Sequence, residues 1–542
     1  NKIILFNGEI YNYIEIRKKL IKLGYKFFSN GDTEVVLKAI YEWGSNAYKL
    51  FKGMWAIVIY DKATNHISFS RDRFGEKPLY YFLCDDGIFF ASEIKTLREL
   101  IPIKTKINEY YLIKFLQNGY KSLFNDESTF YKKIFCIKKS SIFDLSIYKN
   151  KVKFNNKKYW KIETKEKITD YSNLVKKLKR KILQSIELTL RSDVPMAFCM
   201  SGGVDSNTII SIAKKVFNYD VKGFTIKNQN SDYDEAIQVK KSVKFLGIDH
   251  QFVEAKKDDF LTNLEEQIKH RAMPVFTISY YLHNLLLRKI SRDGYKVSLS
   301  GTGGDEIYSG YHDFHLLFLK NLKKDNEKKF SQFLSEWKKE QLPYLRNPLL
   351  RNYKEFLIKP PVYDFNFPFE SEYLNKDIIK KIKLSFIKYS KNSLKDRMLN
   401  SLFHESVPVI LHEDDLNSMQ YSVENRSPIL NHEILEILMS CNYKNFYKRN
   451  ISKNILRDSV SEFVEPSIVS NTTKVGFNSS LTDICNLNSA AFKSFILEET
   501  EVDKYFNKDK ILLSLKNINI NNHHTKILFN YINCKIFLKN FG

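Results

Sequence analysis

Residues 201–206 read Ser-Gly-Gly-Val-Asp-Ser and combine groups that can bind phosphate. The two glycines let the backbone approach an anion closely, and the two serines can donate hydroxyl hydrogens to phosphate oxygens. Asp205 can hold the cation that accompanies a phosphate. An ordinary strand-to-helix turn is the competing interpretation, because serine and glycine are common in such turns.

Hydrophobic patterns predict the elements that hold this turn. Residues 194–200 are apolar and have the length of a buried strand. Residues 207–216 place Ile209, Ile210 and Ala213 at helical spacing. A helix that begins directly after the turn would point its free N–H groups at the anion. We therefore expect a phosphate site at the end of this strand.

Strands and helices alternate beyond the turn. We expect strands at residues 221–226, 250–253 and 296–299, and helices at residues 233–246 and 280–291. This alternation predicts an open, doubly wound parallel sheet whose site lies at the carboxyl ends of its strands.

The turn at residues 201–206 lacks both the Gly-Lys-Ser/Thr ending that grips a terminal phosphate and the dinucleotide-binding spacing. It resembles the pyrophosphate loop of ATP pyrophosphatases, which split ATP into AMP and pyrophosphate, so the resemblance implies adenylation. The Ile226 backbone amide could read the adenine edge, and Met200 could pack on the ring. The predicted ATP-binding residues are Met200, Ser201, Gly202, Gly203, Asp205, Ser206, Ile226, Ser300 and Gly301.

Length and composition indicate a cytoplasmic protein with several domains. A chain of 542 residues is too long for one core, and 43% hydrophobic residues suffice for packed cores. No stretch approaches twenty uninterrupted apolar residues, so we expect no membrane span. The six cysteines form no CxxC pair and no metal-ligand spacing, which fits reduced thiols in the cytoplasm.

The net charge of +24 raises the question of nucleic-acid binding. Lysine, asparagine, isoleucine, phenylalanine and tyrosine are abundant along the whole chain, and no basic arm stands out. We therefore attribute the charge to a lysine-rich composition of the whole chain, and we expect no nucleic-acid partner.

Four phrases precede residue 95, and they resemble the class II glutamine amidotransferase domain of the glutamine-hydrolysing asparagine synthetase family. They read FNGEIYNY, DTEV, RDRFGEKPLYY and ASEIK, and they occur in that family's order and spacing. The resemblance implies that Asn7, Gly8 and Glu9 line a glutamine site and that Asp32 holds the α-amino group of glutamine. A helix N-cap before Thr33 is the alternative role for Asp32.

One departure concerns the nucleophile. That family attacks glutamine with an N-terminal cysteine whose α-amine serves as the base. This chain begins at Asn1, in a predicted strand, and has no cysteine before Cys84. We therefore expect no glutaminase activity from the chain as given, and we favour a truncated record over a natural loss.

Residues 300–306, Ser-Gly-Thr-Gly-Gly-Asp-Glu, again follow a predicted strand and resemble the family's SGxGxDE element. The resemblance implies that Asp205 and Asp305 share a magnesium ion on the departing pyrophosphate and so act in catalysis. Solvated loop carboxylates are the alternative. Thr302 replaces an acidic residue common in the family, and with it a carboxylate that could orient the amine or take its proton.

The third phrase runs from Glu413 to Pro428 and resembles the family's DRxSMAxSxExRxP run, with Leu416 in place of arginine. Its acidic cluster, residues 413–415, could supply a base for ammonia. Glu424 and Arg426 could equally form a structural ion pair. Further on, Lys474 lies in a KVGF element similar to the family's KxGF, which implies a catalytic lysine that stabilises charge on the α-phosphate.

The resemblance covers nearly the whole chain and implies an α/β protein of two parts. Residues 1–160 would form an α+β layered, Ntn-type glutamine amidotransferase domain that is N-terminally incomplete. Residues 168–542 would form a doubly wound ATP pyrophosphatase domain with a helical C-terminal part. Residues 101–165 look strand-like.

The implied enzyme is a ligase that uses ATP and magnesium to adenylate the aspartate side chain and then aminates it. The ammonia would come from glutamine and reach the second site through an internal tunnel. Amidation of another carboxylate, such as a sugar acid in polysaccharide assembly, and a tRNA-modifying ATP pyrophosphatase stay open as alternatives. An inactive partner subunit and a homodimer also stay open.

Overall fold

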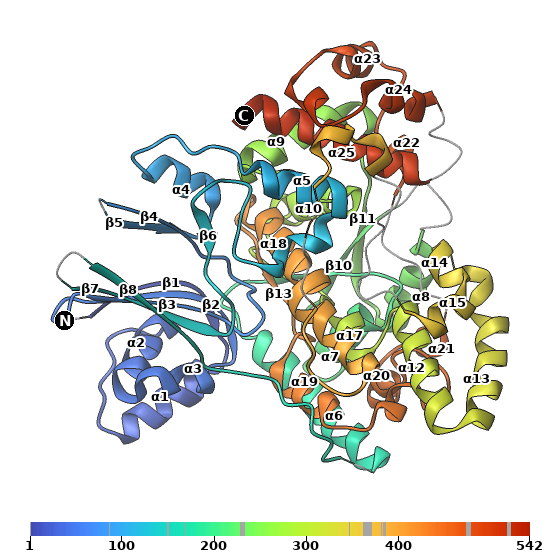
Figure 1. Ribbon diagram of the computed structural model, residues 1–542. Coiled ribbons are helices and arrows are strands. Elements are labelled where there is room, and N and C mark those ends of the chain that lie inside the picture. The colour runs from blue at the N-terminus through green and yellow to red at the C-terminus, as the bar shows by residue number, and fades with distance from the viewer. Residues whose placement is uncertain are drawn as a thin grey trace. The chain divides into compact units, whose positions relative to one another are not determined.

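The computed structural model describes residues 2–85, 87–148, 151–168, 170–227, 234–345, 347–360, 371–380, 382, 386–472, 479–516 and 522–542 (Figure 1). The chain forms two compact units. Unit 1 comprises Asn1–Leu112 and Asp126–Ile162, and unit 2 comprises Ile113–Asn125 and Glu163–Gly542. Among the helices that the structure describes, none has the length and apolar content to cross a bilayer.

Unit 1 is built from two antiparallel sheets and short helices. The larger sheet has the order β1-β2-β3-β7-β8, and the smaller sheet has the order β5-β4-β6. The strands are β1 (Lys2–Ile10), β2 (Gly53–Asp61), β3 (His66–Arg71), β4 (Tyr80–Cys84), β5 (Gly87–Ala91), β6 (Ile134–Cys136), β7 (Ser141–Tyr148) and β8 (Lys151–Lys158). The helices are α1 (Tyr13–Lys22), α2 (Asp32–Trp43), α3 (Ala47–Leu50) and α4 (Ile94–Leu100).

Two apolar clusters give unit 1 its layers. One cluster lies between the larger sheet and helices α1 to α3, with Trp55 of β2 fully buried in it. The other lies between the two sheets and includes Phe69 of β3 and Leu79. Because strand side chains alternate between faces, β2 contributes Ile57 to the first cluster and Val58 to the second. The predicted layered α+β architecture is confirmed.

Unit 2 is organised around a parallel sheet of order β11-β10-β9-β12-β13. Its strands are β9 (Met196–Cys199), β10 (Lys222–Ile226), β11 (Asp249–Val253), β12 (Val297–Leu299) and β13 (Glu424–Arg426). The strand order reverses between β9 and β12, where ligands bind in doubly wound sheets. The predicted parallel sheet is confirmed.

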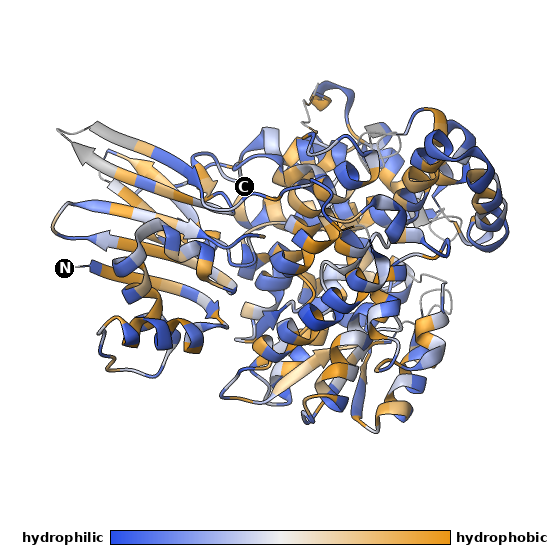
Figure 2. Cartoon of the chain, turned by 90° about the horizontal axis from the view of Figure 1, so that it is seen from below, coloured by the Kyte–Doolittle hydropathy of each residue, from blue (hydrophilic) through white to orange (hydrophobic). Residues whose placement is uncertain are grey.

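Helices make up most of unit 2, and Figure 2 shows hydrophobic and hydrophilic residues interspersed along them. Before β13 they are α6 (Tyr171–Thr189), α7 (Val204–Lys215), α8 (Ala236–Leu246), α9 (Phe260–Arg271), α10 (Ile278–Arg292), α11 (Gly304–Tyr308), α12 (His312–Asp325), α13 (Glu327–Glu340), α14 (Pro348–Arg351), α15 (Tyr353–Ile358), α17 (Ser393–Asn400) and α18 (Ser406–Met419). After β13 they are α19 (His432–Met439), α20 (Asn454–Val460), α21 (Pro466–Ser470), α22 (Leu481–Ile484), α23 (Ala490–Leu497), α24 (Lys508–Lys516) and α25 (Asn522–Phe541). The predicted helical C-terminal part is therefore present.

The strand-like expectation for residues 101–165 is wrong over part of that range. α5 (Glu109–Asn118) is helical, and a 3₁₀ segment follows at Tyr120–Asn125. Leu112, Phe115 and Leu116 are buried at helical spacing, so packing outweighs the β propensity of the surrounding aromatic and β-branched residues.

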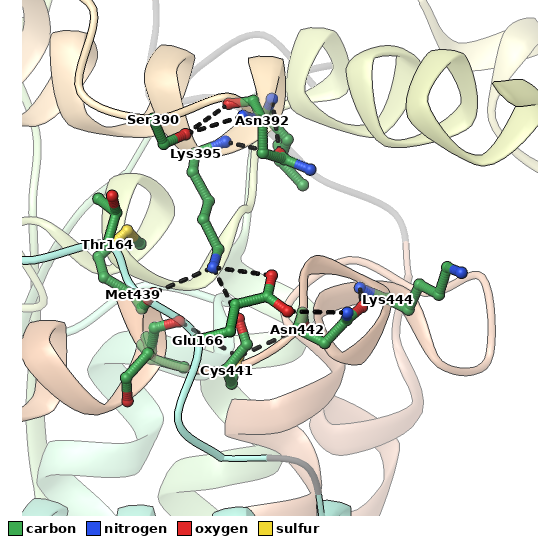
Figure 3. Close-up of polar contacts among 12 residues, drawn as sticks. Thr164, Glu166, Ser390, Asn392, Lys395, Met439, Cys441, Asn442 and Lys444 are labelled. Carbon is green, nitrogen blue, oxygen red and sulfur yellow. Dashed lines mark hydrogen bonds and ion pairs between the residues drawn. The ribbon is translucent and has the colours of Figure 1, made fainter. Parts of the chain in front are cut away.

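The longer segment of unit 2 begins at Glu163, and the buried Lys395 connects its first residues to helices of the same unit (Figure 3). Lys395 Nζ donates to the carbonyl oxygens of Cys441 (2.7 Å) and Met439 (3.0 Å) and lies 3.4 Å from Glu166 Oε1. Asn442 Nδ2 donates to the other oxygen of Glu166 at 3.0 Å. These contacts join α17, the end of α19 and residues 164–168.

Candidate functional site

The turn after β9 is held in shape by its own polar groups. Ser201 N donates to Ser206 Oγ at 3.1 Å, and Gly203 N donates to Ser201 Oγ at 3.2 Å. Asn207 Nδ2 donates to the carbonyl oxygens of Ser201 (2.9 Å) and Gly203 (2.7 Å). The N-cap residue of α7 is Gly203, so no side chain caps this helix. The N–H groups of its first turn therefore face the strand end, as in an anion site.

The second turn lies directly beside the first. β12 pairs with β9 in parallel, with Leu299 opposite Phe198, so the two turns leave adjacent strand ends. A methyl carbon on Gly301 would lie 3.0 Å from Ser206 N, and one on Gly304 would lie 2.5 Å from Asp205 Cγ. Glycine is what lets the turns approach this closely.

Lys453 joins the two turns. Its Nζ lies 2.7 Å from Asp305 Oδ1 and also contacts Asp205 Oδ2. The residue precedes α20 and adopts a left-handed backbone with φ of 56°, which is uncommon for a residue with a side chain. A methyl carbon on Gly310 would overlap both Lys453 and Asp305, so Gly310 leaves the room for this contact.

Asp205 and Asp305 stabilise the charged form of Lys453. Burial alone would lower the pKa of its ammonium group, but the charges of Asp205 and Asp305 outweigh burial and raise that pKa above its usual value. The two carboxylates therefore converge on one positive charge. Sequence reasoning missed Lys453, because it is one of 86 basic residues and belongs to none of the motifs.

Two residues predicted to contact adenine lie at neighbouring strand ends. Met200 N donates to Phe224 O at 2.8 Å, and Thr225 Oγ1 donates to Met200 O at 2.8 Å. Ile226 ends β10 and is buried, as is Met200. Both belong to the strand-end edge that carries the two turns.

The three acidic residues of α18, Glu413 to Asp415, lie in different environments. Arg271 Nη1 donates to Glu413 Oε2 at 2.6 Å, and both side chains are 0% exposed, which makes this a structural ion pair. Asp414 instead faces the second turn, where Thr302 Oγ1 donates to its Oδ2 at 2.9 Å. Asp415 is buried on the same helix.

Three other features singled out in the sequence are the pair of Glu424 and Arg426, Leu416, and Lys474. Arg426 Nε donates to Glu424 Oε1 at 2.6 Å, so the structural ion pair between them exists. Leu416 is buried on α18. Lys474 and the rest of its KVGF element lie outside the described residues.

The predicted glutamine-binding residues come together inside unit 1. Asn7, Gly8 and Glu9 lie on β1, and Ile10 N donates to Asp32 Oδ2 at 2.9 Å. The N-cap interpretation of Asp32 is wrong, because Gly31 is the N-cap and Asp32 is the first residue of α2. A side chain on Gly8 would overlap the backbone of Met54 on the paired strand.

Two further observations in unit 1 concern Asn7 and Cys84. Asn7 Nδ2 donates to Ser92 Oγ at 3.1 Å, which ties the first phrase to the last one. Cys84 is half-buried at the end of β4.

Two family models match the chain. The model for asparagine synthase matches residues 177–526, and the model for a glutamine amidotransferase domain matches residues 1–160.

Curated relatives extend over most of the chain. Asparagine synthetase (glutamine-hydrolyzing) 1 of Bacillus subtilis strain 168 is 26% identical, over 95% of this chain and 81% of the relative. Putative asparagine synthetase (glutamine-hydrolyzing) 2 of Methanocaldococcus jannaschii is 29% identical, over 59% of this chain and 62% of the relative. Asparagine synthetase (glutamine-hydrolyzing) 3 of B. subtilis is 25% identical, over 86% and 74%.

Proposed function

Since the chain belongs to the asparagine synthase family, we propose that it makes asparagine from aspartate, ATP and ammonia derived from glutamine. AMP and pyrophosphate are the other products. The observation that carries the proposal is the convergence of Asp205, Asp305 and Lys453 at the two turns of the strand-order reversal.

The reaction has two steps. An oxygen of the aspartate side chain attacks the α-phosphorus of ATP, and the bond to the β-phosphate oxygen breaks, which releases pyrophosphate. The nitrogen of ammonia then attacks the acyl carbon, the bond to AMP breaks, and the nitrogen loses a proton.

The two turns hold the nucleotide. Ser201, Gly202, Gly203 and Ser206 bind its phosphates, and Ser300 and Gly301 of the second turn face them. Met200 and Ile226 bind the adenine. Lys474 stabilises charge on the α-phosphate as the adenylate forms and reacts.

Magnesium is the cation that we propose for the phosphates. Asp205 and Asp305 would hold it, since both carboxylates already converge on the ammonium of Lys453 and oxygen ligands suit this ion. A bound magnesium ion would supply charge neutralisation for the departing pyrophosphate. Lys453 supplies a second positive charge from the chain itself.

Glutamine is the proposed source of ammonia, although the given sequence has no cysteine before Cys84 that could cleave it. Asn7, Gly8, Glu9 and Asp32 bind it in unit 1, supported by the match of residues 1–160 to the glutamine amidotransferase domain. Ammonium salts can replace glutamine in a test of the second site.

The test measures pyrophosphate release with ATP, ammonium chloride and aspartate. We expect release that requires aspartate and is matched by equal amounts of AMP and asparagine. Asp305→Asn should lower kcat/KM by about 10²-fold or more, since it removes a charge from the phosphate site. Asp509→Asn on α24 alters an exposed aspartate and should leave the rate unchanged. Release that is independent of aspartate would contradict the proposal.

Aspartate is the proposed acceptor. Their names favour aspartate over a sugar acid or tRNA, which the sequence had left open. In the same assay, a sugar acid that replaced aspartate with equal kcat/KM would reverse this preference.

We also propose a cytoplasmic location and a homodimer. Free thiols at all six cysteines support a reducing compartment. Light scattering on the purified protein checks the dimer.

A further inference from the structure

The amine-forming step needs a proton acceptor as well as a nucleotide site. When ammonia attacks the acyl carbon, its nitrogen becomes positively charged and must lose a proton before the amide is formed. A positioned side chain can accelerate such a transfer by about 10²–10⁴-fold. The acceptor has to lie at the strand-end turns, where the acyl adenylate would be held.

Most carboxylates near these turns are poorly suited to accept a proton. Asp205 and Asp305 face the ammonium of Lys453, and an adjacent positive charge favours the deprotonated form. Glu413 has both oxygens engaged, by Arg271 Nη1 at 2.6 Å and by Phe276 N at 3.3 Å, and its side chain is 0% exposed.

Asp414 is held by neutral groups instead. Thr302 Oγ1 donates to its Oδ2 at 2.9 Å, and Asn425 Nδ2 lies 3.5 Å from the same oxygen. His283 Nδ1 lies 3.3 Å from Oδ1, and this imidazole is uncharged at neutral pH because burial lowers its pKa to about 4. Thr302 is half-buried, and its hydroxyl lies 3.0 Å from Ser300 Oγ. The hydroxyl of Thr302 thus connects a buried carboxylate to the nucleotide turn.

We propose that Thr302 and Asp414 form a proton relay for the amine-forming step, an inference that rests on the proposed function. As the C–N bond forms, the proton of the attacking nitrogen passes to Thr302 Oγ1, and the proton of that hydroxyl passes to Asp414 Oδ2. AMP leaves with the electron pair of the broken C–O bond. Thr302 touches the nucleophile, whereas Asp414 acts through Thr302.

The surroundings of Asp414 predict the pH dependence of this step. Burial raises the pKa of Asp414 to about 7, opposed by the hydrogen bond from Thr302 and aided by Asp415. The other titratable groups around it are His283 and Tyr280 of α10, Cys199 of β9, and Glu413 of its own helix. Burial raises the pKa of Cys199 and of Tyr280, so both stay protonated near neutral pH. The amination rate per free ammonia should therefore rise through a pH of about 7 and then level off, as Asp414 loses its proton.

The experiment separates the two steps in full-length protein. Aspartate-dependent exchange of pyrophosphate into ATP reports adenylation, which needs no proton acceptor, and asparagine formation from ammonium chloride reports amination. Asp414→Asn and Thr302→Val should keep the exchange rate and lower amination by about 10²–10⁴-fold. Thr302→Ser keeps the hydroxyl and should keep both rates.

Two further readouts distinguish a relay from a structural role. The pH inflection near 7 should vanish in Asp414→Asn. Hydroxylamine, whose adduct loses its proton more readily than that of ammonia, should restore most of the rate in both variants. The double variant should be no slower than either single one, because both remove the same relay.

The results that would refute the relay differ from those that would refute the proposed function. Equal losses of exchange and amination, or unchanged amination in either variant, would overturn the relay. If Asp414→Asn fails to fold, Thr302→Val carries the same test, since a valine has nearly the shape of threonine. Absence of aspartate-dependent exchange in the unaltered protein would instead refute the proposed function, and the relay with it.

Discussion

Lys453 shows how a single residue acquires a role from its surroundings. The same ammonium contacts a carboxylate from each turn, although Asp205 and Asp305 are 100 positions apart in the chain. Its left-handed backbone is a sparsely populated state for a residue with a side chain, and such states often mark functional positions.

We expect Lys453→Met to weaken ATP binding. Loss of a charge-assisted hydrogen bond costs about 1.5–3 kcal/mol, so KM for ATP in pyrophosphate release should rise by about 10- to 150-fold. Lys240→Met on α8, an exposed lysine, is the matched control and should leave KM unchanged. An unaltered KM in Lys453→Met would argue against contact between this lysine and the phosphates.

Some residues of this site could be predicted from the sequence, and others could not. Asp205 and Asp305 were predictable because each follows glycines at the end of an apolar run. Lys453 was not, since its place depends on how the segment before α20 folds back against both turns. Asp414 and Glu413 are adjacent and chemically alike, and only their packing against Thr302 and Arg271 distinguishes them.

At the scale of elements, the close approach of two turns is the central feature. Gly304 is the first residue of α11. The Asp205 carboxylate lies where a side chain on Gly304 would be. The parallel pairing of β9 with β12 fixes this approach, because both strands end at the same edge.

Gly304→Ala should therefore separate folding from activity. Alanine suits a helix start, but its methyl carbon would lie 2.5 Å from Asp205 Cγ and push that side chain away. We expect ammonia-dependent activity to fall by about 10²-fold while the melting temperature changes little. Gly31→Ala, where a methyl carbon would contact nothing within 4 Å, should leave that activity unchanged. Full activity in Gly304→Ala would show that the position of Asp205 is unimportant.

Elements with a strong pattern were predictable, whereas elements defined by tertiary pairing were not. The expected strands at residues 194–200, 221–226, 250–253 and 296–299 correspond to β9, β10, β11 and β12. β13 was missed because Glu424–Arg426 is short and polar, and it becomes a strand only by pairing with β12. α5 was missed because its aromatic residues mimic a strand.

At the scale of the whole molecule, the two candidate sites belong to different units. The proposed nucleotide-binding residues that the structure describes lie in unit 2, and the proposed glutamine-binding residues Asn7, Gly8, Glu9 and Asp32 lie in unit 1. Each unit also has buried apolar residues of its own.

Calorimetry should therefore resolve two unfolding transitions that respond to different ligands. ATP with magnesium at 100 times its dissociation constant stabilises the unit that binds it by about 2.7 kcal/mol, which should raise the midpoint of one transition by a few degrees. A glutamine analogue should raise the midpoint of the other. A single transition shifted by either ligand would contradict independent sites.

The contacts of Lys453 with two aspartates also give the site a counterion that belongs to the chain. This ammonium would keep Asp205 and Asp305 from repelling each other before a divalent cation arrives, and it would then shift to the phosphates as the cation takes its place between the carboxylates. Departure of pyrophosphate with such a cation would return the ammonium to the carboxylates, so the two turns would stay charge-compensated between turnovers.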